Sequence, residues 1–128
     1  MDEASLLYTE THEWLLVADD ECTVGITRFA VEQLRDIVYL ELPSVGKKLK
    51  AGEVFGHIES VKSVNDLYSP VAGEVSAVNQ PVADDPVILN QDPYAKGWLI
   101  KVRPAAAVDK TRLKDKSGYD AQVASESH

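Results

Sequence analysis

The chain has 128 residues, 45% hydrophobic and 27% charged, which is typical of one soluble globular domain with its own core. Its formal net charge of −8 disfavours nucleic acid and anionic membranes as partners, because both bind basic surfaces. No apolar run approaches the roughly 18 residues that span a bilayer, and the acidic start Met1–Glu3 is unlike a secretory signal or a transit peptide. We therefore expect a cytoplasmic protein, with a processed mitochondrial form as the alternative.

The residue types that perform most enzyme chemistry are not grouped in this sequence. Cys22 is the only cysteine, so we expect a buried thiol and no internal disulfide. His12, His57 and His128 are scattered, without the spacing of metal ligands. There is no Gly-rich phosphate loop and no Ser/His/Asp set. The sequence therefore predicts neither a catalytic centre nor a metal site.

The first part of the chain predicts short strands around one helix. Residues 13–18 and 22–26 flank an acidic turn and predict a β-hairpin. Thr27 is suited to cap a helix over residues 27–35, whose apolar positions recur at helical spacing. Residues 37–42 are rich in β-branched and aromatic side chains and predict the next strand.

Two Pro-x-x-Gly turns punctuate the middle of the chain, at Pro43–Gly46 and Pro70–Gly73. Between them, residues 54–61 and 64–68 predict two strands. This near-symmetry indicates two similar strand–turn units, folded against each other in a flattened antiparallel β-barrel or sandwich. The fold class is therefore mainly β.

The last part of the chain predicts two more strands and a helix. The strands are expected at residues 74–78 and 98–102. Asp109 is expected to cap a short helix that ends near Lys116 and is broken by Ser117-Gly118. Large aromatic side chains in strands usually lie in the core, so we expect core positions for Trp14, Trp98 and Tyr39.

Lys62 lies where the chain reverses between the strands predicted at residues 54–61 and 64–68. Neither Gly nor Pro separates these strands, so the lysine should stand exposed on a tight, rigid tip. The simplest interpretation of such a position is an ordinary surface lysine in a turn. The alternative is a carrier lysine, whose flexible stem presents an amine for attachment of a prosthetic group that does the chemistry.

The segment Glu59-Ser60-Val61-Lys62 resembles the lipoylation motif of the glycine cleavage H-protein family. Gly46, Glu59 and Gly73 stand at the family's spacing from the lysine for recognition by lipoate-attaching enzymes. Further blocks are similar to the family, in its order, from about residue 6 to 103. They are Thr11-His12-Glu13-Trp14, Gly25-Ile26-Thr27, Val38 through Pro43, Ser69-Pro70 with Gly73-Glu74-Val75, and Asn90-Gln91-Asp92-Pro93-Tyr94 with Gly97-Trp98.

The resemblance implies a single lipoyl-carrier domain over residues 1–128, with a lipoyl-domain-like, hybrid barrel-sandwich fold. Its lipoyl-type core would lie at about residues 37–80, and a C-terminal helical segment at about 105–124. It implies a carrier without catalytic activity, with lipoate covalently attached to Lys62 as N6-lipoyllysine. We also expect a monomer that binds neither nucleic acid nor membrane.

The resemblance also implies the partners of such a carrier. The lipoyl arm would take the aminomethyl group of glycine from a pyridoxal-phosphate-dependent glycine decarboxylase to a tetrahydrofolate-dependent aminomethyltransferase. Dihydrolipoyl dehydrogenase would then restore the disulfide. Because the loaded arm hydrolyses readily in water, a carrier benefits from a sheltering cleft.

In the family that cleft is polar at the amine, and the aligned residues here are Thr11, Glu13 and Asp66. A carboxylate close to the cationic amine would supply a charge-assisted hydrogen bond. Two simpler interpretations stay open: Thr11 satisfies only turn backbone, and Asp66 is a solvated hairpin residue.

Two positions depart from the family pattern. Arg35 stands in place of the glycine of the usual Leu-Gly-Asp, and Ala72 stands in place of the serine of the usual Ser-Gly. If the family glycine adopts a positive φ, an arginine there would be strained. We therefore expect Arg35 in ordinary helical or bridge geometry, and we expect neither departure to affect the lysine.

Three other interpretations compete with this one. A lipoyl domain of a 2-oxoacid dehydrogenase complex usually carries Asp-Lys-Ala at its tip, whereas this chain has Val61-Lys62-Ser63 and long additions at both ends. A biotinyl lysine is flanked by methionines, and Met1 is the only methionine here. An interaction or lipoate-relay module without the glycine-cleavage partners stays open, because docking surfaces have no short signature.

Overall fold

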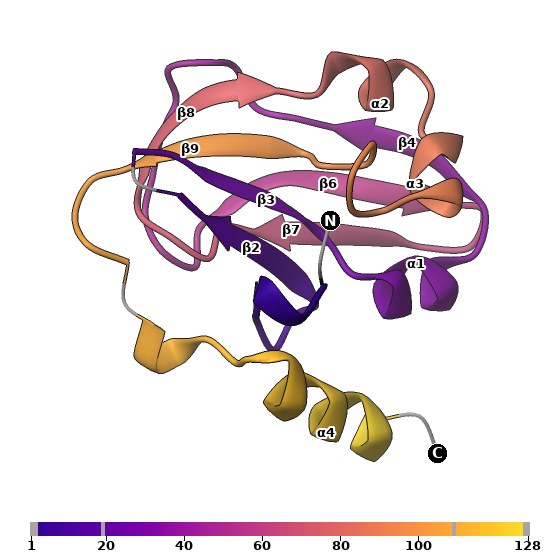
Figure 1. Ribbon diagram of the computed structural model, residues 1–128. Helices are drawn as coiled ribbons and strands as arrows, with labels where there is room; N and C mark the ends of the chain where they lie inside the picture. The colour runs from indigo at the N-terminus through magenta and orange to yellow at the C-terminus, as the bar shows by residue number, and fades with distance from the viewer. Residues whose placement is uncertain (1–2, 19, 109, 127–128) are drawn as a thin grey trace.

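Two antiparallel β-sheets pack against each other to form the body of the molecule (Figure 1). The computed structural model describes residues 3–18, 20–108 and 110–126. Its larger sheet has the strand order β1-β2-β3-β9-β8-β5, and its smaller sheet the order β4-β6-β7. The mainly β fold is thus confirmed as a sandwich whose sheets are not closed into a barrel.

The elements have the following bounds. The larger sheet contains β1 (Leu7–Tyr8), β2 (Glu13–Val17), β3 (Cys22–Ile26), β5 (Lys48–Leu49), β8 (Gly73–Val78) and β9 (Ile100–Pro104). The smaller sheet contains β4 (Ile37–Glu41), β6 (Val54–Ser60) and β7 (Val64–Tyr68). The helices are α1 (Arg28–Leu34), α2 (Gln80–Asp84), α3 (Val87–Gln91) and α4 (Lys116–Glu126), with 3-10 turns at Glu3–Ser5 and Lys110–Arg112.

The hairpins and the first helix form where the sequence predicts them. β2 pairs with β3, and β6 pairs with β7, both antiparallel. The Thr27 hydroxyl accepts a hydrogen bond from the Ala30 N–H at 3.2 Å, so Thr27 is the N-cap of α1. The last strand begins at Ile100, two residues later than expected.

The core lies between the two sheets and draws apolar side chains from both. Trp14 is buried in a second cluster with Tyr8, Tyr94 and Tyr119, against which Trp98 packs half-buried. Tyr39 is 45% exposed, so its expected core position is wrong. A bulge in β4 interrupts the alternation of faces, and the following Leu40 takes the inward position. Cys22 is a buried free thiol, as expected.

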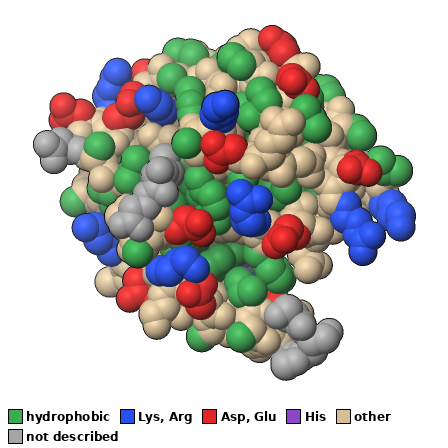
Figure 2. Space-filling model, turned by 45° about the vertical axis from the view of Figure 1, so that its right-hand side comes forward, with side chains coloured by type: hydrophobic (Ala, Val, Ile, Leu, Met, Phe, Trp, Pro, Cys, Tyr) green, Lys and Arg blue, Asp and Glu red, His purple; other side chains and the backbone are tan. Residues whose placement is uncertain are grey.

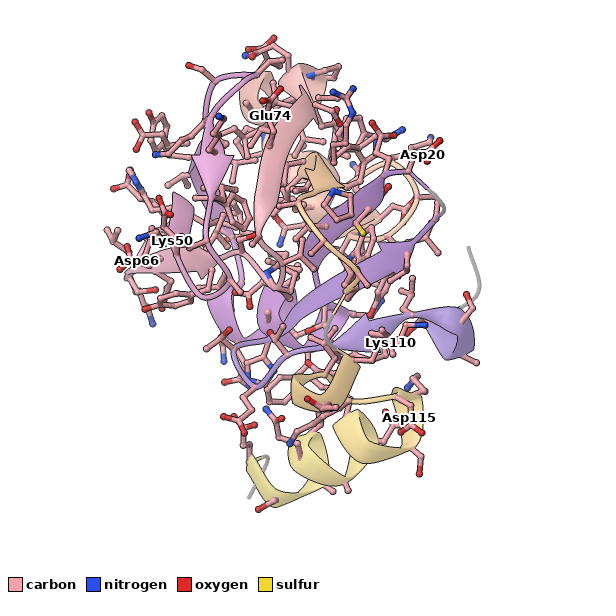
Figure 3. All side chains as sticks on the ribbon, turned by 90° about the vertical axis from the view of Figure 1, so that its left-hand side faces the viewer. Asp20, Lys50, Asp66, Glu74, Lys110 and Asp115 are labelled. Atoms are coloured by element: carbon pink, nitrogen blue, oxygen red, sulfur yellow. The ribbon has the colours of Figure 1, made fainter. Side chains whose placement is uncertain are left out.

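The C-terminal helix begins later than the sequence predicts. The expected break at Ser117-Gly118 is wrong, because α4 runs through these residues, and only a 3-10 turn precedes it. Asp109, the expected cap, lies outside the described residues. Instead, the Asp115 carboxylate accepts a hydrogen bond from the Gly118 N–H at 2.8 Å, which is N-cap geometry. Asp115 is labelled in Figure 3 at the start of this helix.

Two short helices, α2 and α3, occupy residues for which the sequence predicts no element. Each has five residues, too few to show a helical repeat of apolar positions. Among the described residues, no helix is long and apolar enough to cross a membrane.

Arg35 ends α1 with φ 66° and ψ −121°, so the expectation of helical or bridge geometry is wrong. This combination suits glycine and is rare for residues with a Cβ atom. Hydrogen bonds impose it: the Arg35 N–H donates to the Val31 carbonyl at 2.8 Å, and the Arg35 carbonyl accepts from the Asn90 side-chain amide. The backbone carbonyl of the next residue, Asp36, accepts from the Val61 N–H at 3.2 Å, so this turn adjoins the lysine tip. That neither departure affects the lysine stays a prediction.

We predict that Arg35→Gly stabilises the protein. The substitution removes backbone strain of about 1–3 kcal/mol from the folded protein. Glycine also makes the unfolded chain more flexible, which favours the unfolded state by about 0.5–1 kcal/mol. The expected net rise in the free energy of unfolding, measured by urea denaturation, is about 1 kcal/mol. Arg35→Ala is the control, because it removes the guanidinium but keeps the Cβ atom. An equal rise in the alanine variant would show that side-chain charge, not backbone strain, is responsible.

Candidate functional site

Lys62 lies at the tip of the β6–β7 hairpin and is exposed, as expected. The neighbouring Val61 and Val64 are 71% and 62% exposed, so apolar side chains flank the lysine. The tip lies at the same end of the molecule as α1 (Figure 1). Figure 2 brings this end forward and shows hydrophobic, acidic and basic side chains intermixed at the surface.

Ser60 makes the tip rigid. Its hydroxyl oxygen accepts hydrogen bonds from the Lys62 N–H at 3.3 Å and the Ser63 N–H at 3.2 Å. The Ser60 N–H donates to the Ser63 carbonyl at 2.9 Å, and the Val61 N–H donates to the backbone carbonyl of Asp36. These bonds satisfy the N–H groups of Val61, Lys62 and Ser63, so the reversal requires neither Gly nor Pro. Sequence analysis missed this role, although a serine just before a reversal is a known signal for such a turn.

The residues expected to guide lipoate attachment fall into two groups. Gly46 and Gly73 lie together beside β5 and β8: the Gly46 N–H donates to the Val75 carbonyl at 2.8 Å, and Gly73 pairs with Leu49. Glu59 lies in β6, three residues before Lys62, with its carboxylate 3.8 Å from the His57 ring.

Both glycines have structural reasons to be glycine. Gly46 has φ 96°, which disfavours any residue with a side chain. A Cβ atom on Gly73 would lie 2.3 Å from the Arg103 carbonyl oxygen, because β8 and β9 approach closely there. Glu59 has no such backbone role, and its half-buried carboxylate is within reach of another protein. A role in recognition remains a prediction for all three residues.

A cleft of about 480 Å³ lies beside β7. Its lining is mostly apolar along α1 and the strands, and the segment Glu10–Glu13 forms its polar end. The structure brings all three predicted cleft residues, Thr11, Glu13 and Asp66, to this cleft. Its lining residues are Glu10–Glu13, Ile26, Phe29, Ala30, Gln33, Leu34, Ile58, Asn65–Tyr68 and Glu126.

Asp66 lies at the rim of the cleft rather than inside it. It is exposed, lies opposite His57 of β6, and stands at the outer edge of the molecule (Figure 3). It also lines a second hollow on the outer face of the smaller sheet. Because side chains alternate along a strand, Asn65 shares the inward face with the buried Leu67. Asn65 is thus the polar β7 residue of the cleft that sequence analysis missed.

Glu13 is 1% exposed and holds the polar end of the cleft. One carboxylate oxygen accepts from the hydroxyls of Thr9, at 2.6 Å, and Thr11, and the other accepts from the Tyr68 N–H at 3.3 Å. The sequence does not single out Thr9, because residues 9–12 form a turn in which the side-chain alternation of a strand does not apply.

No cationic side chain pairs with Glu13 in the part of the chain whose side chains are described. Burial raises the pKa of the Glu13 carboxyl above its usual range, and the hydrogen bonds from Thr11, Thr9 and Tyr68 oppose this shift only in part. A cation entering the cleft would stabilise the ionised form. Residues 3–18, 20–108 and 110–126 hold no group of three His, Cys, Asp or Glu residues arranged to bind a metal ion.

Known proteins resemble this chain over most of its length. The sequence model of a family described as "Glycine cleavage H-protein" matches residues 6–126. Two relatives named glycine cleavage system H protein come from Bacteroides fragilis and Nitratidesulfovibrio vulgaris. The first is 51% identical over 116 residues, 91% of this chain and 92% of its own. The second is 46% identical over 125 residues, 98% of this chain and 97% of its own.

A solved structure supports the same relationship. The crystal structure of a glycine cleavage system H protein from Mycobacterium marinum aligns with a TM-score of 0.86 at 41% sequence identity. The alignment covers 93% of this chain and 96% of that one.

We predict that Ser60→Ala loosens the tip without unfolding the protein. Two backbone amides lose their acceptor, which costs about 1 kcal/mol of stability. Hydrogen exchange measured by NMR should quicken at Lys62 and Ser63. Ser63→Ala is the matched control, since it removes a hydroxyl from the same turn but leaves both amides bonded to Ser60. Unchanged exchange in the Ser60 variant would contradict the role of its hydroxyl.

We also predict that Glu13 makes stability fall as pH rises. Its pKa is raised from 4.5 in the folded protein, so its contribution is complete below pH 4.5 and is lost as pH rises through the folded-state pKa. Glu13→Gln keeps the shape of the side chain but removes the charge. At pH 7 its free energy of unfolding should exceed that of the wild type by on the order of 1 kcal/mol. The difference should shrink toward pH 4.5.

Urea denaturation across this pH range measures the effect. The control is Glu32→Gln, which removes an exposed carboxylate of α1 outside the cleft and should track the wild type. A difference between Glu13→Gln and the wild type that does not vary with pH would contradict the assignment to this carboxyl.

Proposed function

Because this chain belongs to the glycine cleavage H-protein family, lipoyl carriers of the glycine cleavage system, we propose that Lys62 is its lipoylated residue. Members of the family are carriers rather than catalysts. The observation that carries the proposal is the placement of Lys62, exposed on a rigid tip from which β7 leads along the wall of the cleft. The proposed division into a lipoyl-type core at about residues 37–80 and a C-terminal segment at about 105–124 follows the same relationship.

The residues present fit a lipoyl group. Strands rise about 3.3 Å per residue, so the cleft residues of β7 lie roughly 10–20 Å from Lys62 along the strand. A lysine stem joined by an amide to an eight-carbon acid spans roughly 14 Å when extended. The apolar side chains of Phe29, Ala30 and Leu34 line the cleft and offer a surface for its hydrocarbon part. When bound, the group supplies a disulfide for redox and group-transfer chemistry.

The group to be carried is, we infer, the aminomethyl group of glycine. A primary amine is cationic at neutral pH, and the buried Glu13 carboxylate lacks a cationic partner among the described side chains. An ammonium in the cleft would gain a charge-assisted hydrogen bond and would lower the cost of keeping Glu13 ionised. Thr11 orients the carboxylate through its hydroxyl, and Asp66 adds negative charge at the rim.

Family membership supports the partners that this cargo requires. They are a pyridoxal-phosphate-dependent glycine decarboxylase as donor and a tetrahydrofolate-dependent aminomethyltransferase as acceptor, with dihydrolipoyl dehydrogenase restoring the disulfide. Lipoate-attaching enzymes would read Glu59 directly, while Gly46 and Gly73 would act through the fold. The family match over residues 6–126 disfavours the alternative of a 2-oxoacid dehydrogenase lipoyl domain. The expected cytoplasmic location stays a prediction.

Glycine-dependent exchange of labelled bicarbonate by a glycine decarboxylase tests the function. The chain produced in a lipoate-competent host should support exchange, and Lys62→Arg should abolish it, because arginine has no amine to acylate. Lys50→Arg, at another exposed lysine, is the matched control and should retain full exchange. Exchange supported by Lys62→Arg would overturn the proposal.

Glu59→Gln should slow lipoate attachment several-fold with unchanged stability.

A further inference from the structure

The last turn of α4 closes one side of the cleft. Glu126 lines the cleft together with Phe29 and Ala30 of α1. Its Oε1 lies 3.1 Å from Nε2 of His12, and its Oε2 accepts from the Gln122 side-chain amide at 2.7 Å. Gln122 in turn donates to the Glu10 carbonyl at 2.9 Å. The Glu126 carboxylate is therefore held at the mouth of the cleft from two directions.

His12 connects this carboxylate to the rest of the site. Its Nδ1 lies 2.8 Å from the Tyr119 hydroxyl, and that hydroxyl lies 2.7 Å from the Thr27 hydroxyl. A carboxylate only accepts, so a neutral His12 donates from Nε2 to Glu126 and accepts at Nδ1 from Tyr119. Tyr119 stacks on Tyr8, with ring centroids 4.6 Å apart, which anchors α4 to the body of the protein.

The backbone of His12 is strained in the conformation that places its ring between Tyr119 and Glu126. Its φ of 72° is uncommon for a residue with a side chain, and it lies between Thr11 and Glu13 of the polar end. Such strain persists only where surrounding contacts over-determine it, and it gathers at functional sites. Here the His12 N–H donates to the Thr9 carbonyl at 3.2 Å and the His12 carbonyl accepts from the Thr27 N–H at 3.0 Å, and the ring bonds to Tyr119 and Glu126 add to these backbone contacts.

The chemistry of the lining selects one class of ligand. Among the described residues that line the cleft, His12 is the only basic one. Carboxylates come from Glu13 in its depth, Glu126 at its mouth, and Glu10 and Asp66 elsewhere in the lining. The other lining side chains of α1 and the strands are mostly apolar. An apolar chain that ends in an ammonium group matches this pattern better than a neutral or anionic one.

We propose that Glu126 is a second carboxylate of the cargo site, which binds the cationic end of the carried group, and that His12 and Gln122 position it. The C-terminal helix is then part of the site, not only of the scaffold. This inference rests on the proposed function, because the carried amine supplies the cation.

The pKa values of the two carboxyls, Glu126 and Glu13, are shifted in opposite directions, which gives the two residues different roles. The hydrogen bond from Gln122 lowers the pKa of the Glu126 carboxyl, and the neighbouring His12 acts in the same direction. Glu126 therefore stays ionised at the mouth and attracts the amine, while the buried Glu13 gains its charge fully once the amine has entered.

The test uses the full chain before lipoylation, with n-pentylammonium as probe and n-pentanol as its neutral counterpart. NMR titration of the cleft amides gives both dissociation constants. We expect the wild type to prefer the ammonium. Glu126→Gln should weaken ammonium binding roughly two- to fivefold, as for a partly exposed ion pair, and leave pentanol binding unchanged. His12→Asn should have the same effect on the binding of the two probes as Glu126→Gln, because asparagine tolerates a positive φ but does not reach Glu126.

Matched variants separate the possible failures. Glu32→Gln removes one exposed charge of α1 outside the cleft and should bind both probes as the wild type does. If Glu13→Gln loses the preference for ammonium but Glu126→Gln retains it, the cargo site stands and the role of Glu126 is overturned. If Glu126→Gln weakens the binding of n-pentylammonium and n-pentanol equally, Glu126 has only a structural role, and its proposed role in binding the cation is overturned as well. No preference for ammonium in the wild type would contradict the inference and the proposed cargo together.

Discussion

The pairing of β6 with β7 is the interaction on which both ends of the site depend. At one end, the Ser60 hydroxyl satisfies the amides of Lys62 and Ser63 and so fixes the lysine on a rigid tip. At the other end, the Tyr68 N–H donates to the buried Glu13 carboxylate. Between them, β7 forms a wall of the cleft. One hairpin thus sets the proposed point of attachment, the proposed path of the arm along the protein and the polar end of that path.

The cleft retains features that cost stability, and the proposed function accounts for them. A buried carboxylate that has no cationic partner among the described side chains and a histidine with positive φ are both unfavourable in a folded protein. Both lie in the segment Thr11–Glu13, and hydrogen bonds from three sides hold them in place. A carrier that must hold a cationic group briefly and then release it gains from a site completed only by its cargo.

Much of this arrangement was predictable from sequence, because it depends on local patterns. Strand-like runs on either side of an acidic turn and of Lys62 predicted the hairpins, Thr27 predicted the start of α1, and the motif spacing singled out Lys62. Tertiary contacts decided the rest. Arg35 adopts a glycine-like conformation because Asn90, 55 residues away, bonds its carbonyl. Glu126 reaches the cleft only because Tyr119 anchors α4, and no periodicity in the chain announces that contact.

Intact mass tests the central claim, that Lys62 carries a lipoyl group, most directly. The chain from a lipoate-competent host should divide into the unmodified mass and one heavier species, larger by about 188 Da for a single lipoyl amide. In Lys62→Arg only the unmodified mass should remain. An unmodified wild type, or the same increment in the Lys62 variant, would contradict the account.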